Sequence, residues 1–332
     1  MEQLELVTVE IEEAGRLIKV GRVPHLRLAF LLLDNAAEVM MHLAVQGQNL
    51  FQGVYASLRQ QMLSMQSVLG DDRDFMNHLR EIESKVLPDK TLNQLDQEFR
   101  AKANFLAERG LLDSSLATIV KKLHRYRNEL YHTMHIRREV LEPAALVYFD
   151  VACSLLTSLM HPHSYSSGEP YTDLARFGVA RLCGLADDTT ARVAAQLRTE
   201  VGMDVPNVRA ALIAHLAGRL DDLDEVIFMI HSALPDEYDE LDDAIRVIQT
   251  DWKNDLLPLD ELRRQRFPVS ERKLGLWRRQ VASLGDIDDR YAMFVRFAGI
   301  EDSFEPFETE AQDFYSAIDR MVQAAVDEAL ER

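Results

Sequence analysis

A short basic segment from Lys121 to His135 concentrates the side chains best suited to chemistry on a phosphate group. The four-residue spacing of an α-helix places His124, Asn128 and His132 in one row, beside a row that contains Arg127. A histidine can move a proton near neutral pH, and a guanidinium can hold phosphate oxygens and the charge that develops on them. Together these groups suffice to cleave a phosphodiester without a metal ion.

The order Arg127-Asn128, followed by His132, matches the Arg-x4-6-His signature of HEPN domains, in which the residue after the arginine is commonly polar. The resemblance covers roughly residues 20 to 160, about half of the chain. Other segments that resemble helices of the family are residues 30–38, 105–112 and 123–128.

The resemblance implies a homodimer in which two Arg127/His132 sets face each other across a cleft, with RNA as substrate and no cofactor. His132 would transfer protons to or from the 2′-hydroxyl and the leaving 5′-oxygen, while Arg127 would hold the scissile phosphate. Asn128, Tyr131 and His124 would position the substrate, Tyr131 by stacking on a base. Such nucleases often serve as toxins or phage-defence effectors, and this role is expected here by analogy alone.

A second hypothesis treats the chain as a non-catalytic dimerisation and protein-interaction module, since many HEPN domains are inactive scaffolds. The formal net charge of −18 argues against a general nucleic-acid binder, although a local basic cleft would still permit an RNA enzyme. In this hypothesis the acidic C-terminal half engages a protein partner.

Hydrophobic periodicity predicts an all-α fold, because apolar residues recur at helical spacing and no period-two alternation of any length occurs. The cluster of proline, glycine and serine between His161 and Pro170 predicts a domain boundary. We therefore expect a HEPN-like helical bundle over residues 1–162, a linker over 163–170 and a second helical domain of unknown role over 171–332.

The first half is expected to contain several amphipathic helices. Residues 3–20 show helical spacing, although their β-branched content leaves a strand as an alternative. The methionines among residues 51–65 are interpreted as core residues. The other expected helices run from Pro24 to about Gln46, from Thr91 to Arg109, and from the N-cap candidates Asp113, Ser114 and Ser115 to about Ile136.

Asp34, Glu38 and His42 lie at successive spacings of four on the second expected helix. They could ligate a metal, but pairing with Arg127 or another cation of the bundle is favoured. In the second half, the arginine-rich segment 263–279 is expected to be a solvated face or a dock for the acidic segment 235–243, rather than an RNA surface.

Several classes of site and location are disfavoured. The sequence contains no His-Glu-x-x-His, no paired Cys-x-x-Cys and no glycine-rich phosphate loop, so neither a zinc site nor a nucleotide triphosphatase is expected. Its two cysteines, Cys153 and Cys183, cannot form a disulfide framework. The acidic N-terminus does not resemble a signal peptide, and the longest apolar run, Leu28–Leu33, is far shorter than a membrane span. We expect a cytoplasmic protein with no membrane contact.

Overall fold

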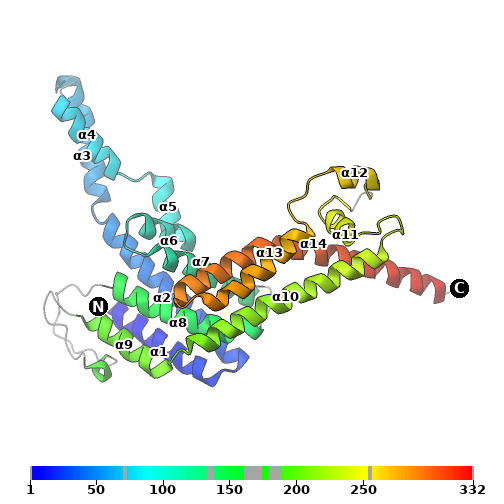
Figure 1. The fold of residues 1–332 in the computed structure, drawn as a ribbon. Coiled ribbons are helices and arrows are strands. Elements are labelled where there is room, and N and C mark those ends of the chain that lie inside the picture. Colours follow the sequence, from blue (N-terminus) through cyan, green and yellow to red (C-terminus); the bar gives the residue numbers. More distant parts are fainter. Residues whose placement is uncertain are drawn as a thin grey trace. The chain divides into compact units, whose positions relative to one another are not determined.

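The computed structural model describes residues 2–69, 73–132, 138–160, 174–178, 188–252 and 256–330 (Figure 1). Every regular element within these ranges is a helix, which confirms the all-α prediction. The chain forms two compact units, Met1–Met203 and Asp204–Arg332.

The first unit ends later than the sequence predicted. Its last helix, α9 (Thr189–Val201), was assigned to the second domain, yet it packs on α1 (Glu2–Val20) and α8 (Arg138–Leu159). The Arg198 guanidinium donates to the Asp150 carboxylate over 2.6 Å, which ties α9 to α8. The boundary was misplaced because the Pro/Gly/Ser segment was read as a domain limit; that segment itself lies outside the described residues.

Helix α1 presents the predicted apolar face to the bundle. Leu4, Val7, Ile11, Ala14 and Ile18 are all buried, and the strand alternative is wrong. A Cβ atom on Gly15 would lie 2.7 Å from Val201 Cγ2 and 2.9 Å from Phe149 Cε2. The close approach of α1 to α8 and α9 therefore requires a glycine at this position.

Helix α2 (Val23–Asn49) lies at the centre of the first unit and contacts α1, α6, α7 and α8. Pro24 stands in its first turn, where a missing N–H costs no helical hydrogen bond. The helix continues past the predicted end at Gln46. Its buried residues include Phe30, Leu33 and Met40, so α2 forms much of the core.

The predicted helix over residues 91–109 is two helices, α5 (Asp89–Gln97) and α6 (Phe99–Glu108). Glu98 between them has extended backbone angles, φ −99° and ψ 118°. As predicted, Gly110 follows the second helix in the left-handed region, with φ +70°.

Helix α7 (Ser114–His132) begins at the predicted cap, because the Asp113 carboxylate accepts the Ser115 N–H over 2.8 Å. The predicted extension to Ile136 lies outside the described residues.

Helices α3 (Gln52–Leu69) and α4 (Arg73–Lys85) pair with each other and extend away from the rest of the first unit (Figure 1). The prediction that the methionines of this region are core residues is wrong for Met65, which is 51% exposed. The helical period was correct, but α4 is the main neighbour of this helix among the described residues of the first unit. Other exposed apolar residues of this region are Leu50, Phe51, Val54, Leu58 and Leu63.

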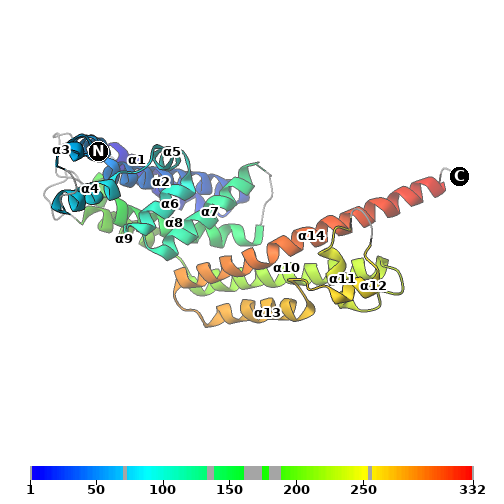
Figure 2. The ribbon, with the colours of Figure 1, turned by 90° about the horizontal axis from the view of Figure 1, so that it is seen from above.

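The second unit is built around three long helices that lie side by side (Figure 2). They are α10 (Val205–Ala233), α13 (Glu271–Ala282) and α14 (Arg290–Leu330). Trp277 and Phe304 are buried in their core. The shorter elements are α11 (Leu241–Ile248), α12 (Leu259–Arg264) and the 3₁₀ turns η1 (Ala175–Phe177, first unit) and η2 (Ser283–Asp286).

Arg263 confirms the predicted docking of the basic segment on the acidic one. Its guanidinium contacts Asp239 over 3.0 Å and the buried Asp243 over 2.6 Å. The hydrogen bond from Arg263 holds the pKa of the Asp243 carboxyl below its ordinary value.

Two segments, Val23–Gln66 and Val140–Leu159, are long and apolar enough to span a membrane by length and composition. The tested windows are 50% and 78% buried inside the structure. A buried core helix meets the same criterion, so these segments are weak indications.

A fragment of residues 1–203 is expected to unfold at a higher temperature than a fragment of residues 1–162. The shorter fragment lacks α9, whose Val193 and Leu197 are buried, and each buried aliphatic side chain contributes about 1.5–3 kcal/mol. Two such side chains amount to about 3–6 kcal/mol, so the melting temperature, followed by far-UV circular dichroism, should fall by roughly 6–24 °C. Equal melting temperatures would show that α9 does not belong to the first unit.

Candidate functional site

A buried carboxylate lies where α2, α7 and α8 meet. Asp34 is 2% exposed, and its Oδ1 accepts the Tyr148 hydroxyl over 2.7 Å. The same oxygen lies 2.9 Å from His124 Nδ1, while Oδ2 lies 3.4 Å from Arg127 Nε. Because a buried charge without partners is very costly, these contacts are what keep the carboxylate in the core.

Tyr148 remains a donor to this carboxylate. Burial, together with the negative charge of Asp34, raises the pKa of the Tyr148 phenol well above its ordinary value. The hydroxyl therefore keeps its proton at any physiological pH and cannot act as a base.

A chain of hydrogen bonds runs from Arg127 to Asp34 and fixes the orientation of each group. The Arg127 guanidinium can only donate, so the atom of Asn128 that lies 2.9 Å from Nη1 is the Oδ1 acceptor. The Asn128 amide nitrogen then faces His124 Nε2 over 3.1 Å and donates to it. The remaining ring proton of His124 consequently sits on Nδ1, directed at Asp34.

His124 is held on all sides. Its ring stacks on Phe99 with a centroid separation of 3.9 Å and an interplanar angle of 8°. Because Asn128 and Asp34 occupy its two nitrogens, the ring supports Arg127 through Asn128 rather than facing a substrate. The predicted substrate-positioning role of His124 and Asn128 is therefore indirect in this arrangement.

Arg127 stands at the edge of this network with its side chain 30% exposed. Its guanidinium carbon lies 5.6 Å from the ring centroid of Tyr131, which is 60% exposed. A guanidinium fixed by a carboxylate and an amide on one side, and partly exposed on the other, can bind an anion from solution.

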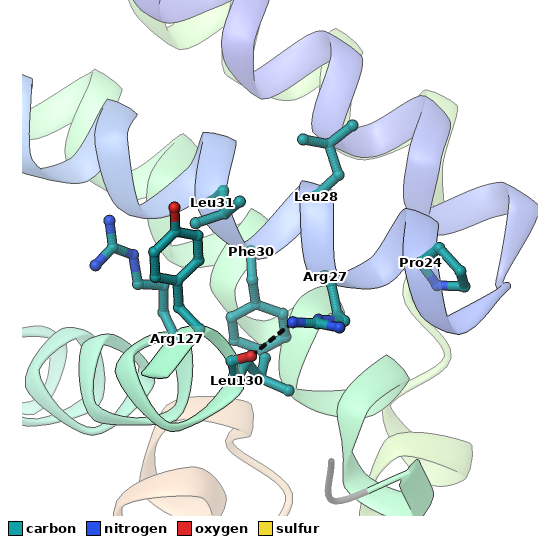
Figure 3. Close-up of a pocket in the computed structure, with 8 residues that line it drawn as sticks. Pro24, Arg27, Leu28, Phe30, Leu31, Arg127 and Leu130 are labelled. Atoms are coloured by element: carbon teal, nitrogen blue, oxygen red, sulfur yellow. Dashed lines mark hydrogen bonds between the residues drawn. The ribbon is translucent and has the colours of Figure 1, made fainter. Parts of the chain in front are cut away.

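A pocket of about 250 Å³ opens between α2 and α7 beside Arg127 (Figure 3). Arg27 lies across it and donates over 2.8 Å to the carbonyl of Leu130, a residue in the last described turn of α7. The lining residues are Pro24, Arg27, Leu28, Phe30, Leu31, Arg127, Leu130 and Tyr131.

Helix α7 is basic within an acidic chain. It carries Lys121, Lys122, Arg125 and Arg127, against the single acidic residue Glu129. The full chain has a net charge of −18, so this helix carries the opposite sign of charge, although Lys122 is buried and cannot meet a ligand.

The predicted catalytic histidine, His132, is the last described residue of α7, and its side chain lies outside what the structure describes. The predicted pairing of Asp34 with Arg127 is confirmed, and Glu38 likewise pairs with Lys102 over 2.9 Å. His42 instead lies 2.8 Å from the Gln46 amide. Among the described residues, no three His, Cys, Asp or Glu side chains gather as a metal site.

Sequence reasoning missed Tyr148, Phe99 and Arg27. Tyr148 was counted only as an apolar residue of its helix, although a hydroxyl on an apolar face signals a buried polar partner. Arg27, the fifth residue of α2, gave no such signal in the sequence.

Asp34→Asn is expected to destabilise the first unit by about 2–4 kcal/mol, because it removes the buried counter-charge of Arg127 and places an amide against donors. Both tryptophans of the chain, Trp252 and Trp277, belong to the second unit. Urea denaturation should therefore show an earlier transition by far-UV circular dichroism and an unchanged one by tryptophan fluorescence.

The matched control is Glu83→Gln, which removes the carboxylate partner of Arg59; the two side chains are 41% and 45% exposed, so the loss should cost less than about 1 kcal/mol. Equal stability of Asp34→Asn and wild type would mean that the carboxylate does not organise the site.

No family model, no curated protein and no solved structure matches this chain. The similarity to HEPN domains therefore rests on the sequence pattern around Arg127, and function has to be inferred from the site itself.

Proposed function

We propose that this protein is a metal-independent endoribonuclease of the HEPN type. The observation that carries the proposal is the fixed position of the Arg127 guanidinium, held by Asp34 and Asn128 at the mouth of a pocket on a basic helix. Such an arrangement is prepared to receive a phosphate without reorganising.

Arg127 binds the scissile phosphate and offsets the charge that accumulates on its oxygens during attack. Asp34 does not cancel this function, because the carboxylate lies on the buried side and only one edge of the guanidinium faces it. The Asp34–His124–Asn128 chain prevents the side chain from adopting other rotamers.

His132 performs the proton transfer. The 2′-oxygen attacks phosphorus as its proton is removed, the bond from phosphorus to the 5′-oxygen breaks, and that oxygen receives a proton. This step yields a 2′,3′-cyclic phosphate and a free 5′-hydroxyl, and it requires ribose. His124 cannot share the work, since both of its ring nitrogens are engaged.

A homodimer completes the site in this proposal, because one copy supplies one such imidazole, whereas removal and delivery of a proton proceed more readily with two. The proposed setting is the cytoplasm, with no cofactor. A role as a toxin or phage-defence effector follows by analogy with HEPN nucleases.

His132→Ala should lower cleavage of a structured RNA by about 10²- to 10⁴-fold, the usual contribution of general acid–base catalysis. His78→Ala, an exposed histidine on α4, is the control and should cleave at the wild-type rate. Arg127→Lys should remain impaired, since an ammonium cannot make a planar two-pronged phosphate contact. Cleavage should persist in the presence of a chelator, and a substrate with 2′-deoxyribose at the cleaved position should resist. Equal cleavage by wild type and His132→Ala would refute the proposal.

A second candidate function is a non-catalytic dimerisation module, favoured by the exposed apolar residues around α3. Within Gln52–Leu69 the only charged residue is Arg59, so a second copy of this helix could pack on it without burying unpaired charges. Two copies of an uncharged face are complementary to each other, whereas the acidic remainder of the surface repels itself.

Leu58→Glu should convert a wild-type dimer to a monomer in light scattering, because it places a carboxylate in the apolar face. Leu276→Glu on α13 is the control, since Leu276 is 37% exposed and Leu58 is 39% exposed. A wild-type dimer that survives Leu58→Glu would exclude α3 as the dimer surface. RNA cleavage by the wild type would exclude the non-catalytic function.

A further inference from the structure

The pocket beside Arg127 combines surfaces that fit one class of ligand. Pro24, Leu28 and Leu31 supply apolar walls, and the 1%-exposed Phe30 lies beneath them. Planar cations, with a tyrosine ring, form the polar part of the lining (Figure 3). An apolar slot bordered by guanidinium groups suits a flat aromatic group that is linked to phosphates.

Tyr131 offers the stacking surface. It lies in the last turn of α7 with 60% of its surface exposed, and Arg127 lies over its ring. An exposed tyrosine on a helix surface gains little from packing. Base stacking on an aromatic ring, by contrast, is favourable for every nucleobase.

Arg27 supplies a second cation on the opposite side. One of its N–H groups is engaged by the Leu130 carbonyl, whereas a guanidinium has five N–H donors. Arg27 thus has a structural task at the end of α7 and further donors for a ligand. Two arginines that border one slot can contact the phosphates on both sides of a single nucleotide.

The size of the pocket limits the ligand. At about 250 Å³ it is smaller than the roughly 300–1,000 Å³ of sites that enclose drug-sized molecules. A single base with its sugar can enter it, but a paired base in a duplex cannot turn out to reach it without losing its partner.

We infer that this pocket binds one unpaired nucleobase next to the phosphate held by Arg127, and that the substrate class is single-stranded RNA. Tyr131 stacks on the base, while Arg27 contacts the phosphate on its far side. This inference rests on the proposed nuclease function, because it places the pocket beside the scissile phosphate.

Binding can be measured apart from cleavage with a fluorescent oligouridylate that carries 2′-O-methyl groups throughout. Its 2′-oxygen cannot attack, so anisotropy reports affinity alone. Tyr131→Ala should weaken binding by about 5- to 150-fold, the usual contribution of one stacked base, and Tyr131→Phe should bind as the wild type does. Tyr291→Ala is the matched control, since Tyr291 also lies under an arginine, at 5.0 Å, but outside the pocket.

Arg27→Gln removes the charge of Arg27, and far-UV circular dichroism checks that the variant keeps the helical fold without the bond to the Leu130 carbonyl. Its affinity should fall, and the slope of log affinity against log salt should become shallower by about 0.7, as expected when one contact to a single strand is lost. Arg109→Gln is the control, an exposed arginine that stacks on Phe105 at 4.7 Å.

Wild-type affinity in both Tyr131→Ala and Arg27→Gln would overturn the inference, even if the protein cleaves RNA. The variants could weaken binding while the wild type fails to cleave natural RNA. That result would support the pocket as a binding site for single strands and would refute the nuclease function. Equal affinity for the same sequence as a perfect duplex would also contradict the inference.

Discussion

The first unit depends on a single buried carboxylate. Asp34 occupies the middle of α2, the helix that contacts most of the bundle, and a charge at that position must be paired or the core is destabilised. Its partners come from two other helices, Tyr148 on α8 and both His124 and Arg127 on α7. The same contacts that compensate the charge therefore fix the relative rotation of α2, α7 and α8.

This requirement links stability to function. The contacts of His124 and Arg127 with Asp34 cross from α7 to α2 and fix the position of one helix along the other. The hydrogen bonds among Arg127, Asn128 and His124 then order these side chains within α7. The exposed edge of the Arg127 guanidinium is therefore held in one orientation as well. A local positive site on a chain of net charge −18 also focuses the attraction of a polyanion on a small region, since approach elsewhere is repelled.

Helical periodicity sufficed to predict the class of fold, the face of α1 and the cap of α7, because each depends on local spacing or on one nearby side chain. The pairing of Asp34 with Arg127 was also predictable, since a carboxylate within an apolar helix needs a cation. The break at Glu98 and the exposure of α3 were not, because both depend on which helices meet in three dimensions. The place of α9 in the first unit was unpredictable for the same reason, because it depends on the contact of Arg198 with Asp150.

The hydrogen bond from Arg27 to the Leu130 carbonyl joins the N-terminal part of α2 to the last described turn of α7. It is a single bond that shares no atom with the network around Asp34, so it can open while the partners of Asp34 stay in place. Tyr131 lies in that turn and lines the pocket, so one wall of the pocket can loosen at a temperature at which the first unit remains folded.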